Sequence, residues 1–155
     1  MISIGKVKDK FFRGTIKDYA KRLSRYTKIK YIHLKPGHTT KEMSEKDIAL
    51  VKEKEGEDII NRLSSRDYVM ALDLNGTTYD SESFAEKIRK LRVQGKSNIT
   101  FIIGGSHGLS KAVLKKANTS ISFSKMTFPH QLMQVILIEQ VYRAFKIINN
   151  EPYHK

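Results

Sequence analysis

A short apolar run that leads directly into three glycines constrains the fold of this chain more than any other feature. The run, at residues 98–103, is apolar on both faces, as expected of a strand at the centre of a parallel sheet. Gly104, Gly105 and Gly108 follow it, and a helical pattern begins at Ser110. Open α/β sheets bind ligands at the carboxyl ends of their strands. The sequence therefore predicts an α/β domain with a candidate ligand site at this turn.

Periodic patterns divide the rest of the chain into alternating strands and helices. Ser44 and Asp47 have the spacing of a capping box at a helix N-terminus, and Asn75-Gly76 is expected to turn the chain. The order predicts one domain over residues 1–155, with a mainly parallel sheet flanked by helices. Strands are expected at residues 2–7, 27–34, 67–74, 98–103 and 121–123, and helices at 9–26, 44–63, 81–93, 110–118 and 129–149.

The composition excludes several classes of protein. There is no cysteine, so disulfides and thiolate metal sites are excluded, and the five histidines form no closely spaced pair. We therefore expect no metal site. No apolar run approaches the length of a membrane span, and the first residues do not resemble a signal peptide. A soluble, cytoplasmic domain without a membrane partner is expected.

The net charge of +13 points to a polyanionic partner. Residues 1–50 carry a charge of +8, residues 51–100 are neutral, and residues 101–155 carry +5. A basic protein releases counterions when it binds a polyanion, and nucleic acid is the commonest such partner. The alternative is a solvated basic surface that maintains solubility.

The glycine turn matches none of the common nucleotide or hydrolase motifs. Its Gly-Gly-x-x-Gly spacing is neither the dinucleotide fingerprint nor a phosphate loop, and no lysine follows at the required position. A serine-hydrolase elbow is also absent. His107 is a candidate general base or metal ligand. On these residues alone, a ligand site and a tight turn that needs a positive φ remain equally open.

Four further motifs stand out in the sequence. They are Gly104-Gly-Ser-His-Gly-Leu109, Ser122-Phe-Ser-Lys-Met-Thr-Phe-Pro-His130, Glu139-Gln-Val-Tyr-Arg-Ala-Phe145 and Pro152-Tyr-His-Lys155. Together they resemble the motifs of the ribosomal RNA large subunit methyltransferase H family, the small SPOUT-class enzymes. The resemblance covers essentially the whole chain and implies an α/β fold whose C-terminal part forms a trefoil knot. It implies S-adenosyl-L-methionine as cofactor, a homodimer, and methyl transfer to N3 of a pseudouridine in 23S rRNA within the ribosome.

The family's cofactor-binding positions transfer to the third and fourth strands and to one later segment. Leu72 would line the pocket, and Gly104 would let the main chain approach the ligand. The segment would wrap the cofactor with main-chain groups and apolar side chains; it consists of Phe123, Ser124, Lys125, Met126, Thr127 and Phe128. Taken alone, this segment favours a loop that packs against the sheet over a ligand site. The basic stretch at residues 35–46 carries no strong motif, and its role is open.

The C-terminal motifs supply the catalytic candidates of the resemblance. His154 is a candidate acceptor for the N3 proton, and Tyr153 is a candidate to stack on the base or to hydrogen-bond with it. Arg143 is a candidate to hold a phosphate or a negative uracil carbonyl. The alternatives are that Arg143 pairs with Glu139 one helical turn back and that Tyr153 anchors the tail.

The last predicted helix is apolar over more than one face, which favours a dimer interface over burial inside one subunit. A dimer would let one subunit's tail complete the other's site. The surface expected to face rRNA consists of Lys10, Arg13, Lys17, Lys21, Arg22, Arg25, Lys28 and Lys30. Two other functions remain possible: a non-catalytic RNA-binding or ribosome-binding domain, and a SPOUT methyltransferase that acts on tRNA.

Overall fold

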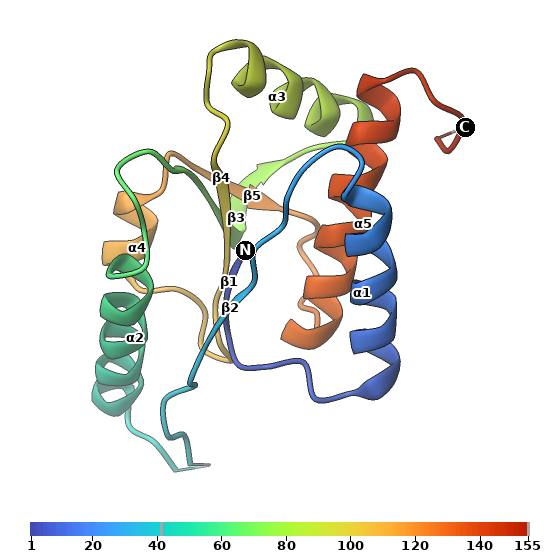
Figure 1. Ribbon diagram of the computed structural model, residues 1–155. Helices are drawn as coiled ribbons and strands as arrows, with labels where there is room; N and C mark the ends of the chain where they lie inside the picture. The colour runs from blue at the N-terminus through green and yellow to red at the C-terminus, as the bar shows by residue number, and fades with distance from the viewer. Residues whose placement is uncertain (41, 155) are drawn as a thin grey trace.

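Strands and helices alternate along the chain in a computed structural model that describes residues 1–40 and 42–154 (Figure 1). Lys41, in the basic stretch of open role, and Lys155, at the end of the tail motif, lie outside the described residues. The strands are β1 (Ile2–Ile4), β2 (Ile32–Leu34), β3 (Tyr68–Thr78), β4 (Ile99–Ile103) and β5 (Thr119–Ser122). The helices are α1 (Lys10–Leu23), α2 (Glu45–Ile60), α3 (Ser81–Val93), α4 (Lys111–Lys116) and α5 (His130–Ile148).

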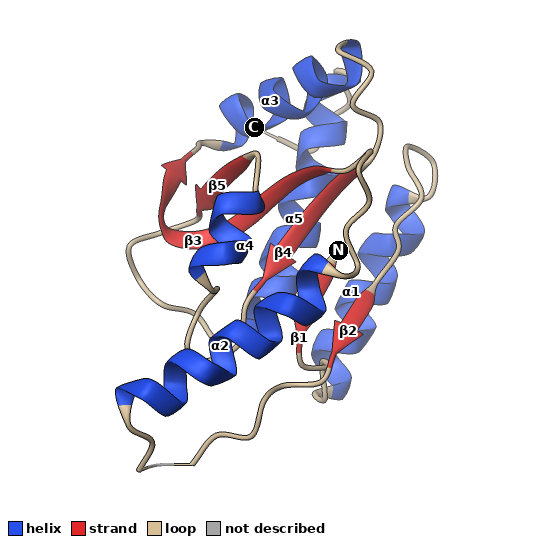
Figure 2. Cartoon of the chain, turned by 90° about the vertical axis from the view of Figure 1, so that its left-hand side faces the viewer, coloured by secondary structure: helices blue, strands red, loops and turns tan. Residues whose placement is uncertain are grey.

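The five strands form one parallel sheet in the order β2-β1-β4-β3-β5. Helices α2 and α4 cover one face, and α1, α3 and α5 cover the other (Figures 1 and 2). Each face has its own apolar cluster, and β4 lies at the centre of the sheet, as its composition predicts. The α/β class with a parallel sheet is confirmed. The trefoil knot stays a prediction. Within the described residues, no helix has the length and apolar character that a membrane span requires.

Strand β2 is shorter than the pattern at residues 27–34 predicts. It lies at the edge of the sheet and pairs with β1, which is itself three residues long, from Ile2 opposite Ile32 to Ile4 opposite Leu34. Residues 27–31 extend beyond the end of β1 and so have no strand to pair with. The alternation of side chains at residues 27–31 predicted a strand, but no neighbouring strand is there to pair with it.

Strand β3 contains a bulge where the sequence predicted a turn. Leu72 and Thr77 both pair with Ile121 of β5, so the residues between them bulge out of the sheet. The prediction that the strand ends at Leu74 and that Asn75-Gly76 turns the chain is wrong, because β5 pairs on both sides of the bulge and keeps the two parts in one strand. The bend needs a glycine, since a Cβ at Gly76 would lie 2.6 Å from the main-chain nitrogen of Ile121.

Helix α5 packs between α1 and α3 (Figure 1). Pro129 precedes it as predicted, and every residue from His130 to Ile148 is buried or half-buried. Burial within the chain therefore accounts for much of its apolar surface. The interface with a second copy stays a prediction. At the other long helix, α2, Ser44 and Asp47 form the predicted capping box.

Candidate functional site

A cavity of about 380 Å³ opens at the carboxyl edge of the sheet, beside the ends of β3, β4 and β5. Ligands of parallel α/β proteins bind at this edge. The cavity collects most of the predicted cofactor residues from three separate segments. Those that line it are Leu72, Gly104, Phe123, Ser124, Met126, Thr127 and Phe128; Lys125 does not line it. The sheet thus brings together residues that are far apart in the sequence.

The glycine turn is a tight turn with a positive φ, which is one of the two interpretations that the sequence left open. Gly108 has a φ of +78°, and its N–H donates to the carbonyl of Gly105 at 3.1 Å. A Cβ at Gly104 would lie 3.0 Å from the carbonyl carbon of Gly108. Because the turn folds back this closely, a side chain at Gly104 would crowd the main chain of Gly108, and the main chain of Gly104 forms part of the cavity wall.

Apolar side chains around the cavity are unusually exposed. Met126 is 71% exposed, Leu74 is 49% exposed and Phe128 is 37% exposed. A loop that only packed against the sheet would bury these groups, because exposed apolar surface is unfavourable in water. The segment at residues 123–128 has no regular secondary structure, and the Ser124 hydroxyl accepts a 3.0 Å hydrogen bond from the N–H of Met126. This arrangement favours a ligand site over a packing loop.

A larger cavity of about 630 Å³ lies at the opposite edge, where Met1, Asp67 and Asn98 precede the strands. None of the predicted site residues lines it. Since ligands of this fold class bind at the carboxyl edge, we place the candidate site in the smaller cavity.

A third cavity, of about 510 Å³, shares a wall with the candidate site. Phe123 and Phe128 line both cavities, and His154 lines the third one together with Gln140 of α5. Arg143 and Tyr153 line neither of the two. Within one chain, the tail therefore lies next to the candidate site without entering it.

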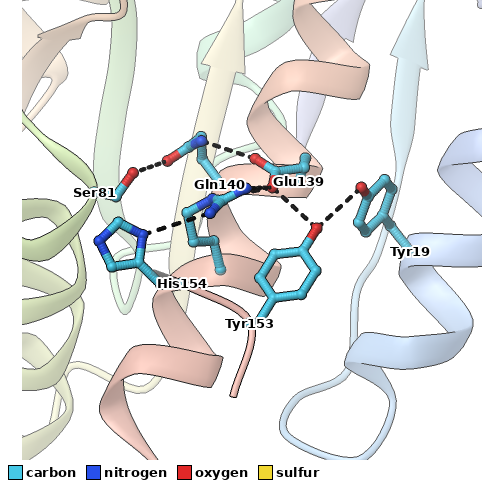
Figure 3. A network of polar contacts seen from close by, with 7 residues as sticks. Tyr19, Ser81, Glu139, Gln140, Tyr153 and His154 are labelled. Atoms are coloured by element: carbon cyan, nitrogen blue, oxygen red, sulfur yellow. Dashed lines mark hydrogen bonds and ion pairs between the residues drawn. The ribbon is translucent and has the colours of Figure 1, made fainter. Parts of the chain in front are cut away.

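The tail folds back onto α5 through a network centred on Glu139 (Figure 3). One carboxylate oxygen accepts from Arg143 Nη2 at 2.6 Å and from the Tyr153 hydroxyl at 3.1 Å. The other accepts from Gln140 Nε2 at 2.8 Å. The Tyr153 hydroxyl also lies 3.2 Å from that of Tyr19 in α1. The predicted alternative pairing of Arg143 with Glu139 is confirmed.

Arg143 contacts both of the other C-terminal candidates, Tyr153 and His154. Its guanidinium carbon lies 4.8 Å from the centre of the Tyr153 ring, and its Nη1 lies 3.5 Å from Nδ1 of His154. Hydrogen bonding to Glu139 raises the pKa of Arg143, so the guanidinium stays charged. Burial and the contact with Tyr19 raise the pKa of Tyr153, so its phenol stays protonated. The structure thus holds a fixed cation and a neutral phenol side by side.

Comparisons with known proteins give the family. A family model described as "Predicted SPOUT methyltransferase" matches residues 1–154. The chain belongs to the SPOUT methyltransferase family. Over its whole length it is 54% identical to the "Ribosomal RNA large subunit methyltransferase H" of Clostridium novyi (strain NT) and 52% identical to that of Clostridium botulinum (strain Alaska E43 / Type E3). The match covers 98% of each relative.

In this SPOUT methyltransferase, sequence reasoning missed several residues that the fold brings to the site. Asp73 and Met133 line the cavity, and Tyr19 and Gln140 complete the network around Glu139. The four-residue spacing of Glu139 and Arg143 had indicated that these two side chains could pair. No signal linked Tyr19 to the tail, since 134 residues separate it from Tyr153. His107 lies in the glycine turn and does not line the cavity, and the described residues contain no cluster able to hold a metal.

Proposed function

We propose that this protein uses S-adenosylmethionine to methylate N3 of a pseudouridine in the 23S rRNA of the large ribosomal subunit. The observation that carries the proposal is the cavity at the carboxyl edge, where Gly104, Leu72 and the segment at residues 123–128 meet. The names of the relatives and the net charge of +13 support an rRNA substrate. The proposal includes a trefoil knot, a homodimer and a site of action on ribosomes in the cytoplasm.

The cavity suits a ligand with a nucleoside and an aliphatic chain. Its volume of about 380 Å³ is within the range of small-molecule sites. Leu72, Leu74 and Met126 offer apolar contacts, and the irregular segment at residues 123–128 offers main-chain donors and acceptors. When bound, S-adenosylmethionine supplies an activated methyl group on its sulfonium. The chain's own part is to hold that group in line with the RNA base, because positioning supplies most of the catalysis in such a displacement.

The tail residues are proposed to handle charge on the base. Arg143 Nη2 donates to Glu139 and Nη1 contacts His154, so the second N–H of Nη1 is left to face a uracil carbonyl or a phosphate. A guanidinium donates and never accepts, so Nδ1 of His154 accepts from it and we assign the ring proton to Nε2. In this arrangement the Nδ1 lone pair of His154 is occupied by Arg143, and the ring offers only its Nε2–H as a donor to other groups. It serves as the proton acceptor only once it has left Arg143, as in an exchange of tails between subunits.

Two measurements test the proposal. Calorimetry of the full chain should detect binding of S-adenosylmethionine, and Gly104→Val should abolish it, since a side chain there meets the main chain of Gly108. Val93→Ala, an exposed substitution at the end of α3, should bind as the wild type does. RNA binding without cofactor binding would support the non-catalytic alternative instead.

Mass mapping of 23S rRNA should then show one methylated pseudouridine in a complemented strain and its absence in the deletion strain. The tRNA fraction of both strains is mapped in parallel. A methyl group that disappears from tRNA, with 23S rRNA unchanged, would replace the proposed substrate.

A further inference from the structure

Phe11 is an exposed aromatic ring that the methyl-transfer site does not account for. Its ring stands at the first turn of α1 and is 76% exposed, while its neighbour Phe12 is half-buried. The two rings contact each other at an angle of 59°, with centroids 6.1 Å apart, and most of the Phe11 surface still faces solvent. A phenylalanine this exposed gains little from burial within its own chain.

Unpaired cations flank Phe11 in the sequence. Lys8, Lys10 and Arg13 are exposed, and within the described part of the chain none of them forms an ion pair. The nearest carboxylate, that of Asp9, accepts hydrogen bonds from the N–H groups of Phe11 and Phe12 and caps the helix. The local surface is therefore an aromatic ring in a positive field.

The same surface lies at the edge of the sheet that holds the candidate cofactor cavity. The side-chain oxygen of Gln131 accepts from the main-chain N–H of Lys8 at 2.6 Å and from that of Asp9 at 3.3 Å. Gln131 lies in the first turn of α5, directly after the segment at residues 123–128. Figure 1 shows the β1–α1 connection and the start of α5 at the same end of the molecule. This tether fixes the first turn of α1 beside the site.

We propose that Phe11 stacks on an unpaired base of the substrate RNA while Lys8, Lys10 and Arg13 hold the phosphates on either side of it. The inference rests on the proposed function and adds a residue that recognises the RNA next to the methylated base. Single-stranded RNA is bound through stacking on aromatic rings and through cations that follow its backbone. An exposed ring with free cations beside it supplies both.

Charge favours RNA over a second copy of this chain as the occupant of this surface. Two copies that met here would bring their lysines and arginines together, and like charges that face each other weaken association. An RNA strand would be attracted by the same charges, and residues 1–50 alone carry +8.

The test measures binding of a fluorescein-labelled 12-nucleotide oligouridine and of a 12-base-pair RNA duplex at several salt concentrations. Phe11→Ala should weaken oligouridine binding at least about fivefold, the lower end of the loss of one stacked base. Phe11→Trp should restore it, because a larger ring stacks at least as well. Val93→Ala is the matched control, since Val93 is 77% exposed and lies at the end of α3 that leads to the opposite edge of the sheet.

The salt dependence separates stacking from charge. Phe11→Ala should leave the slope of log affinity against log salt unchanged, whereas Lys10→Ala should lower it by about 0.7, the value for one phosphate contact on a single strand. Duplex binding should not respond to Phe11→Ala, because its bases are already stacked. Unchanged oligouridine affinity, or an equal loss for the duplex, would overturn the inference. Cofactor calorimetry is independent of this result, so failure of the proposed function is recognised separately.

Discussion

Glu139 is the centre of the network that holds Tyr153 of the tail against α5. Its carboxylate joins Arg143, Tyr153 and Gln140, and through Tyr153 it reaches Tyr19 on α1. This half-buried carboxylate holds the cation of Arg143 over the Tyr153 ring. The chemistry proposed for the tail thus depends on a residue that does not line the candidate cavity.

The raised pKa of Tyr153 predicts a pH-dependent stability. Folding favours the neutral phenol, so its contribution is complete below the unfolded pKa of about 10 and is lost as the pH rises towards the folded pKa. Between pH 8 and pH 10.5, the free energy of unfolding should therefore fall more for the wild type than for Tyr153→Phe. Urea denaturation at both pH values measures this. The other tyrosines are common to both proteins, and an equal fall in the two would contradict the prediction.

The bulge in β3 shows how one element shapes the cavity. By leaving the sheet between Leu72 and Thr77, the strand carries Asp73 and Leu74 into the cavity wall. The two paired regions on either side hold the bulge in place. A regular strand would instead keep these residues paired with β5. The additional residues of the bulge therefore form part of the candidate site.

Gly76→Ala should damage both the fold and the cavity. The new Cβ would meet main-chain atoms of Ile121 at 2.6 and 2.7 Å, and main-chain atoms cannot rotate away. We expect a loss of about 1–3 kcal/mol in the free energy of unfolding, as for overpacking, with weaker binding of S-adenosylmethionine. Urea denaturation and calorimetry measure the two effects.

Gly14→Ala is the control for that substitution. Gly14 lies within α1 and has no atom within 4 Å of its Cβ position, so alanine should stabilise the helix by about 0.5–1 kcal/mol. If both variants behaved alike, the close contact at Gly76 would not be the cause.

At the scale of the whole molecule, the tail and the cofactor cavity of one chain lie side by side but do not merge. Arg143 and Tyr153 line neither cavity, and His154 reaches the third cavity, across the wall formed by Phe123 and Phe128. A site that uses both parts therefore favours a second subunit whose tail enters the first one's cavity. In the proposed homodimer, the tail of each subunit would therefore enter the cavity of its partner.

Mixing two inactive variants tests that arrangement. Tyr153→Ala with His154→Ala removes the tail groups, and Gly104→Val closes the cofactor site. If each site combines one cavity with the partner's tail, random exchange should restore about a quarter of wild-type methylation, because half the dimers then carry one complete site of two. Sedimentation confirms that each variant is a dimer. A monomeric wild type, or no restored activity after exchange, would contradict the shared site.

Much of the fold follows from local patterns. The apolar strand β4, the capping box at Ser44 and Pro129 before α5 are all where the sequence placed them, because each depends on neighbouring residues. Strand β2 and the bulge at Gly76 were not predicted correctly, because each depends on the strand beside it. The alternating pattern and the Asn-Gly pair indicate the local conformation that a segment prefers. They do not indicate which strand pairs with it in the sheet.

The sequence by itself determined the family, the parallel α/β architecture and many of the residues that line the candidate cavity, since these are recorded in ordered motifs and in hydrophobic periodicity. The tertiary structure alone decided that Tyr19 meets the tail, that Phe11 stands exposed beside the site and that Arg143 lies outside the cavity. Such relations join residues that lie far apart along the chain. They are set by how helices pack on a sheet, which no local pattern specifies.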